Sequence, residues 1–132
     1  IIILFFEKHS LDMSANSLME LESVGHLSKL KILIADRNVL SNVSLRGLAG
    51  LELLSLKQNR IETLTDMSDL KKLVNLDLSH NRVSNGFEEL AALKSLRVLV
   101  LSFNKLEQTL ADLHHLVISN LKKLPRLEYL AF

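Results

Sequence analysis

The stretch Leu51–Ile61, LELLSLKQNRI, decides the fold because its pattern recurs along the chain. The pattern is leucine, two variable residues, leucine, one variable residue, an apolar residue, two variable residues, asparagine, one variable residue and an apolar residue. It returns as LVNLDLSHNRV at 73–83 and LRVLVLSFNKL at 96–106, with looser copies at 8–18 and 30–40. The asparagines fall at positions 16, 38, 59, 81 and 104, in steps of 22, 21, 22 and 23 residues. A register this regular predicts a repeat architecture.

The alternation in Leu-x-Leu predicts a short strand in each copy, with its leucines pointing inward. One strand cannot bury an apolar face by itself, so the copies are expected to stack into a parallel sheet with a shared leucine core. Strands are predicted near residues 10–14, 32–36, 53–57, 75–79, 98–102 and 129–132. Each asparagine follows its strand, where the chain turns inward and leaves backbone groups unpaired. We interpret the five asparagines as structural.

With these features the chain resembles the leucine-rich repeat superfamily, in its 22-residue subtype. That subtype places an apolar residue three positions before each repeat, as seen here at Phe5, Leu27, Leu48, Leu70, Leu93 and Leu124. The resemblance implies an α/β fold: a right-handed solenoid with a parallel concave β-sheet and 3₁₀ or short helical turns on the convex side. The apolar rhythm of three from Ile61 to Leu73 predicts such a turn in that return segment.

The two ends depart from the repeat. The insertion 107–126 predicts a longer helical segment, broken near Asn120. The run Leu124–Phe132 resembles the C-terminal cap of the axonemal dynein leucine-rich light chain and the spliceosomal A-prime protein, without the cap's closing Gly-Asn-Pro turn. The apolar run 1–6 is predicted to be a strand or turn stacked on the first repeat. We expect residues 1–132 to form one leucine-rich repeat domain that is a piece of a larger protein.

Composition narrows the partner class. There are 16 basic and 15 acidic residues, a net charge of +1, which provides no general field for nucleic acid or an anionic membrane. The chain has no cysteine, which fits a reducing compartment. We therefore expect an intracellular protein, cytoplasmic, cytoskeletal or axonemal, with a nuclear location as an alternative. The sequon Asn42–Ser44 is a weak indication of an extracellular location instead.

The outward strand positions are the candidate binding residues, because the core does not dictate them. Two apolar clusters emerge there and just beyond the strands, and exposed apolar surface of this kind marks interaction sites. A basic column follows the asparagines, and two charged residues lie on the strands. The predicted partner-binding residues are Ile32, Ile34 and Leu53; Val98, Val100, Phe103 and Tyr129; Arg60, Arg82 and Lys105; and Lys57 and Asp77.

The sequence gives little support to an enzymatic function. Asp77, Ser79 and His80 lie close in sequence, but no nucleophile elbow or oxyanion loop accompanies them. The pair His114–His115 lacks helix-spaced ligands, and no glycine-rich phosphate loop occurs. We predict a protein that is not an enzyme, has no cofactor or metal, and binds a protein partner on its concave face.

Three functional hypotheses follow from the sequence. The favoured one is an intracellular adaptor or assembly factor of cytoskeletal, splicing or phosphatase-regulatory type, as the resemblance implies. A ligand-recognition module of immune type is the alternative, and a purely structural segment of a multidomain protein is the third.

Overall fold

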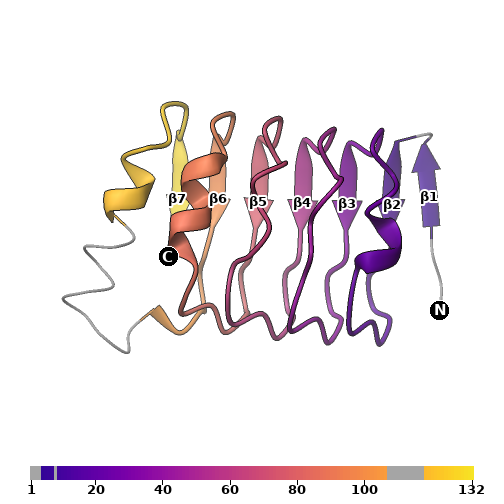
Figure 1. Ribbon diagram of the computed structural model, residues 1–132. Coiled ribbons are helices and arrows are strands. Elements are labelled where there is room, and N and C mark those ends of the chain that lie inside the picture. The colour runs from indigo at the N-terminus through magenta and orange to yellow at the C-terminus, as the bar shows by residue number, and fades with distance from the viewer. Residues whose placement is uncertain (1–3, 8, 107–117) are drawn as a thin grey trace.

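The sheet is the frame of the molecule. The computed structural model describes residues 4–7, 9–106 and 118–132. Within these residues seven strands form one sheet in chain order, and neighbours in sequence are neighbours in space (Figure 1). The strands are β1 Leu4–Glu7, β2 Ser10–Asp12, β3 Ile32–Ile34, β4 Leu53–Ser55, β5 Asn75–Asp77, β6 Val98–Val100 and β7 Tyr129–Ala131. Strands β2 to β7 pair in parallel, which confirms the predicted parallel solenoid.

The first strand runs the other way. β1 pairs antiparallel with β2, with Leu4 opposite Asp12 and Glu7 opposite Ser10. Residues 4–6 of the apolar N-terminal run therefore belong to a strand that stacks on the first repeat, as its sequence predicts. This hairpin pairs the outer edge of β2, which would otherwise present unpaired backbone groups.

The repeat strands β2 to β6 are two residues shorter than predicted. Each begins at the expected residue but ends before the second inward position, because the chain starts to turn there. Ladder hydrogen bonds nevertheless continue beyond the strands, for example from Ala35 N to Ser55 O and from Arg37 N to Lys57 O, both 2.9 Å. The residue before each asparagine then adopts a left-handed conformation, with φ between 53° and 59°, at Ala15, Arg37, Gln58, His80 and Phe103. L-residues rarely adopt this conformation, so the surrounding contacts must stabilise the turn.

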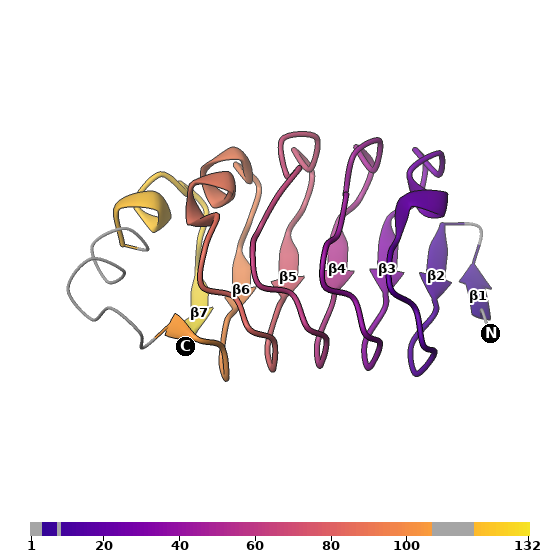
Figure 2. The same cartoon turned by 60° about the horizontal axis from the view of Figure 1, so that its bottom comes forward.

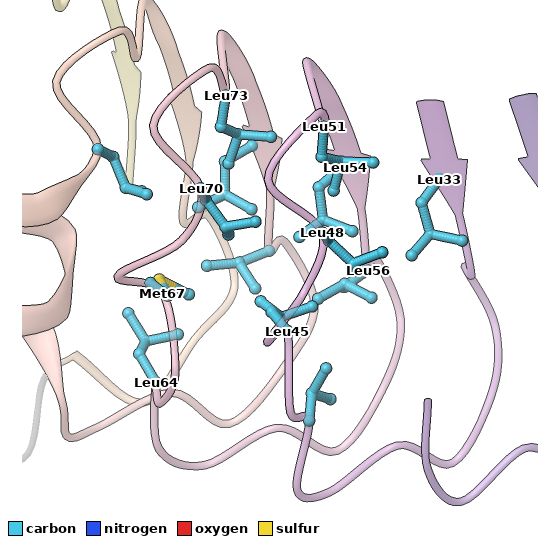
Figure 3. Packing of buried hydrophobic residues seen from close by; sticks show 14 of the residues in the cluster. Leu33, Leu45, Leu48, Leu51, Leu54, Leu56, Leu64, Met67, Leu70 and Leu73 are labelled. Carbon is cyan, nitrogen blue, oxygen red and sulfur yellow. The ribbon is translucent and has the colours of Figure 1, made fainter. Parts of the chain in front are cut away.

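Leucine fills the interior. The central residues of β3 to β6, Leu33, Leu54, Leu76 and Leu99, are at most 1% exposed. Leucines of the return segments pack against them from the other side (Figure 3). At about 1.5–3 kcal/mol for each fully buried large aliphatic side chain, this core stabilises the stack only through the sum of its repeats.

The return segments are less helical than the spacing of their apolar residues predicts. Two carry 3₁₀ turns, η1 Glu22–Val24 and η2 Phe87–Ala92, as expected (Figure 2). The segment from Ile61 to Leu73 has no helix, and its Thr63 instead forms a parallel bridge with Asn85. Leu64, Met67 and Leu70 are still buried there. The prediction was wrong for this segment because an apolar rhythm of three suits an extended chain as well as a 3₁₀ turn.

The predicted C-terminal helix falls largely on residues 107–117, which lie outside the described residues. Residues 118–121 are helical, and Asn120, where a break was expected, lies inside this helix and is buried. Among the helices that the structure describes, none has the length and apolar character needed to cross a bilayer.

Four asparagines connect the repeats, and we call them the ladder asparagines: Asn38, Asn59, Asn81 and Asn104. The amide nitrogen of Asn81 donates to Leu78 O, in its own repeat, at 3.0 Å and to Leu56 O, in the preceding repeat, at 2.9 Å. Its Oδ1 accepts the backbone N–H of Ile61 at 3.0 Å. Asn38, Asn59 and Asn104 make the same three kinds of contact. The structural role inferred for the asparagines is confirmed.

Replacing Asn81 with aspartate is expected to lower the free energy of unfolding by at least ~3 kcal/mol. The carboxylate cannot donate, so Leu56 O and Leu78 O each lose one of the two asparagine hydrogen bonds that they accept, and a buried charge faces them. Urea unfolding followed by circular dichroism measures the loss. The control is Asn85→Asp, at an exposed asparagine outside this ladder. Equal unfolding midpoints for the two variants would contradict the assigned role.

Candidate functional site

Outward strand residues form two apolar patches separated by a polar strand. The early patch is Ile32, Ile34 and Leu53, in which Ile32 of β3 is the register partner of Leu53 of β4. The late patch is Val98, Val100, Tyr129 and Phe103. In it, Val98 of β6 is the register partner of Tyr129 of β7. Between the patches, β5 presents Asn75 and Asp77. Strand pairing therefore brings Ile32 next to Leu53 and Val98 next to Tyr129, and β5 separates the two patches.

The two patches differ in exposure. Ile32, Ile34, Leu53, Val98 and Val100 are half-buried on the pleated surface, as strand residues often are. Phe103 is 73% exposed and Tyr129 is 56% exposed, so the late patch carries two aromatic rings that the fold leaves in solvent. Large aromatic rings with this exposure are typical anchors of protein interfaces.

Phe103 has a partner that the sequence analysis missed. Its ring stacks on His80, with ring centroids 4.3 Å apart and planes inclined by 16°. Both residues precede a ladder asparagine, one repeat apart, and both have left-handed backbone, with φ of 59° and 55°. The shared turn conformation aligns their side chains, and only the column in the repeat alignment could have indicated it.

The predicted charged residues on the strands are partly engaged in the fold. Asp77 Oδ1 accepts the backbone N–H of Ser79 at 2.8 Å. Asp36, which the prediction omitted, accepts Ser55 Oγ at 2.6 Å and the backbone N–H of Lys57 at 2.9 Å. The Lys57 side chain makes no ion pair with any described residue. The Asp77 carboxylate is thus already engaged in a hydrogen bond within its own turn.

The basic column Arg60, Arg82 and Lys105 lies just beyond the C-terminal ends of the strands, and its three side chains are exposed. The backbone N–H of Arg60 donates to Leu40 O, and that of Arg82 donates to Ile61 O, both at 2.9 Å. Arg82 also lies 3.9 Å from a Glu62 carboxylate oxygen, and both side chains are at least half exposed. Such exposed ion pairs contribute little. The column is therefore fixed in its backbone and available in its side chains.

The residues once considered for catalysis do not form a catalytic group. Asp77 binds the backbone of Ser79, the Ser79 residue is only 5% exposed, and the His80 ring stacks on Phe103. His114 and His115 lie outside the residues that the structure describes. In the described part of the chain, no cluster of three histidine or acidic side chains is placed to hold a metal ion.

A polar hollow lies among the return segments of the first repeats. Met19, Asn42, Ser44, Arg46 and Asp66 line it, together with Glu20 and Glu22. Asp66 accepts Arg46 Nε at 2.7 Å and Ser44 Oγ at 3.1 Å. The hydrogen bond from Arg46 is the main cause of a lowered Asp66 pKa. These contacts join one return segment to the next, so Ser44, Arg46 and Asp66 are already engaged within the fold.

Arg46→Gln is expected to raise the pKa of Asp66 towards its ordinary value of 3.8. In the unaltered chain the depressed pKa means that the interaction favours the folded state above that value. This contribution is lost as pH falls through the folded-state pKa. Carbon-13 NMR titration of the Asp66 carboxyl measures the change. An unchanged titration in the variant would contradict the assigned cause.

Phe103→Ala is expected to lower the free energy of unfolding by less than ~1 kcal/mol, because the exposed ring contributes only a stacking contact. Phe87→Ala is the matched comparison, because Phe87 is completely buried, and it should cost about 3–5 kcal/mol. Urea unfolding of both variants measures the difference. A large loss for Phe103→Ala would make that ring a structural element rather than a free anchor.

Comparison with known proteins agrees with this architecture. Two family models match the chain: one described as "Leucine rich repeat" over residues 38–83, and one described as "Leucine Rich repeats (2 copies)" over residues 71–114. A curated protein of Dictyostelium discoideum, named a probable inactive serine/threonine-protein kinase, is 50% identical over 124 residues. That alignment covers 92% of this chain but only 6% of the relative.

Solved structures show the same fold. An internalin (inlF) of Listeria monocytogenes matches with a TM-score of 0.79 at 25% identity, over 94% of this chain and 34% of that chain. A chain of the Drosophila melanogaster SNF/U2A' complex matches with a TM-score of 0.71 at 20% identity, over 90% of this chain and 71% of that chain. The second likeness carries the fold alone.

Proposed function

We propose that this chain, which belongs to the leucine-rich repeat superfamily, holds a protein partner against the solvent-facing side of its sheet, the concave face of the solenoid. Repeats of this superfamily generally mediate protein–protein interaction, and their fold is a non-catalytic interaction module. The finer proposal is an intracellular adaptor or assembly factor. Because the chain spans only 6% of its Dictyostelium relative, this proposal concerns the repeat domain and not the activity of a whole protein.

The exposed aromatic rings of the late patch are the observation that carries the proposal. Phe103 lies past its strand, so strand propensity does not account for an aromatic residue there. Leaving a ring of this size 73% exposed gains no burial energy for the fold. Val98 and Val100 of β6 and Tyr129 of β7 lie on neighbouring strands of the same sheet, so the late patch offers apolar side chains that a partner could cover. Aromatic residues are enriched in the cores of protein interfaces, and tyrosine is enriched among their hot spots.

A recognition module acting beside a kinase-like region is the second candidate. The observation in its favour is the 50% identical relative, which is named a probable inactive serine/threonine-protein kinase. In that arrangement the late patch would bind the molecule to be recognised, or another region of the same polypeptide. The residues involved would be the same, and the identity of the bound molecule would separate the two functions.

Phe103→Glu is expected to weaken partner binding at least ~10-fold, because it places a charge at the centre of an apolar contact. Affinity capture from cell extract with the wild-type domain, followed by calorimetry with each purified captured protein, measures the effect. Met19→Glu is the matched control, because Met19 is 74% exposed but lies among the return segments. The proposal fails if Phe103→Glu binds every captured protein as tightly as wild type does.

A further inference from the structure

The C-terminal ends of the strands carry positive charge that the fold leaves unneutralised. Arg60 and Lys105 make no ion pair with any residue that the structure describes, and Arg82 has only the long contact to Glu62. Arg37, in the left-handed turn of the neighbouring repeat, is a fourth exposed cation on this edge. The whole chain has a net charge of only +1, so this edge is a local concentration of charge. Such a concentration steers and orients an oppositely charged partner.

We propose that this edge docks an acidic amphipathic helix of the partner protein, with carboxylates along the basic column and apolar side chains on the His80–Phe103 stack. The inference rests on the proposed function and gives the partner its chemistry. The binding site then includes this edge, at the C-terminal ends of the strands, in addition to the outward strand residues.

The spacing of the cations favours a helix over an extended segment. Repeats in a parallel sheet stack about 4.8 Å apart, so Arg60 to Lys105, two repeats, spans about 10 Å. Helical positions i and i+7 are about 10.5 Å apart on one face, with i+3 or i+4 between them. Same-side positions of an extended strand fall about 6.7 Å and about 13 Å along, and fit two repeat steps poorly. A row of three carboxylates on a helix therefore matches the three cations.

The aromatic stack lies beside the same row. His80 and Phe103 precede the ladder asparagines Asn81 and Asn104, while Arg82 and Lys105 follow them. One asparagine thus separates each ring from a cation in the chain. A helix that presents carboxylates to the cations would place its adjacent apolar residues against the rings. Apolar and ionic contacts would then come from one element of the partner.

The neighbouring charges favour an acidic protein over a nucleic acid. Asp36 immediately precedes Arg37, and Asp77 is three residues before His80, so carboxylates lie next to the cationic edge. Their oxygens already accept hydrogen bonds from Ser55, Lys57 and Ser79, which holds them in place. A continuous phosphate chain that followed the edge would meet these negative charges. A helix with a single acidic face would not have to approach them.

The test uses fluorescein-labelled peptides of about 15 residues, roughly 22 Å long as helices. The row peptide carries glutamates at i, i+3 and i+7 beside leucines. The scrambled peptide has the same composition with glutamates around the helix. A single-stranded oligo-dT of similar charge represents nucleic acid. Fluorescence anisotropy is expected to give at least ~10-fold tighter binding of the row peptide than of the other two, weakening as salt rises from about 0.05 M to about 0.3 M.

The double variant Arg60→Glu/Arg82→Glu is expected to lose at least ~10-fold in affinity for the row peptide. Lys71→Glu/Lys72→Glu is the matched control, because it changes the net charge equally at exposed residues that precede β5, at the opposite end of the strands. Circular dichroism confirms that both variants fold. Equal losses in the two variants, equal affinity for row and scrambled peptides, no binding of the row peptide, or tighter binding of oligo-dT would each overturn the inference.

These outcomes are separable from failure of the proposed function. If Phe103→Glu abolishes capture of a partner while Arg60→Glu/Arg82→Glu leaves its affinity unchanged, the partner uses the outer strand face and the edge proposal is wrong. If Phe103→Glu leaves capture unchanged, the proposed function itself fails.

Discussion

The hydrogen bonds of the ladder asparagines are the constraint on which the rest depends. A solenoid turn must bring its chain inward over a leucine core that offers no hydrogen-bond partner, and unpaired backbone groups there are costly. One asparagine per repeat solves this, since its side chain forms hydrogen bonds with its own repeat and with the preceding repeat. These same bonds hold the residue before each asparagine in a left-handed conformation. Turn, register and spacing of repeats thus follow from one side chain repeated along the chain.

This frame also determines which residues are free for function. The leucines and the ladder asparagines are used within the fold, whereas the apolar outward strand residues and the cations that follow the asparagines have side chains that reach solvent. The exposed stack of Phe103 on His80 exists because two successive turns have the same conformation. The basic column follows for the same reason, one residue beyond Asn59, Asn81 and Asn104. The exposed side chains recur at the spacing of the repeats. This spacing suits a partner element whose side chains recur at similar intervals, and it links the fold to the proposed protein-binding role.

Much of the fold could be predicted from sequence because a single period of about 22 residues specifies it. The parallel register, the buried leucines and the structural asparagines all follow from that period. The return segment from Ile61 to Leu73 could not be predicted, because a rhythm of three does not distinguish a 3₁₀ turn from an extended chain. The stack of Phe103 on His80 was missed because it depends on backbone conformation. The use of Asp77 by its own turn is a local hydrogen bond that no alternation pattern reveals.

The most direct test of the central claim is backbone amide hydrogen exchange, measured by NMR. The amides of Leu40, Ile61 and Val83 donate only to asparagine side chains of the next repeat, not to a strand. These three amides are expected to exchange as slowly as the strand amides of Leu54 and Leu76, because the asparagine hydrogen bonds open only when the stack of repeats opens. Fast exchange at these three amides, alongside slow exchange in the strands, would contradict the claim that the asparagines hold the repeats together.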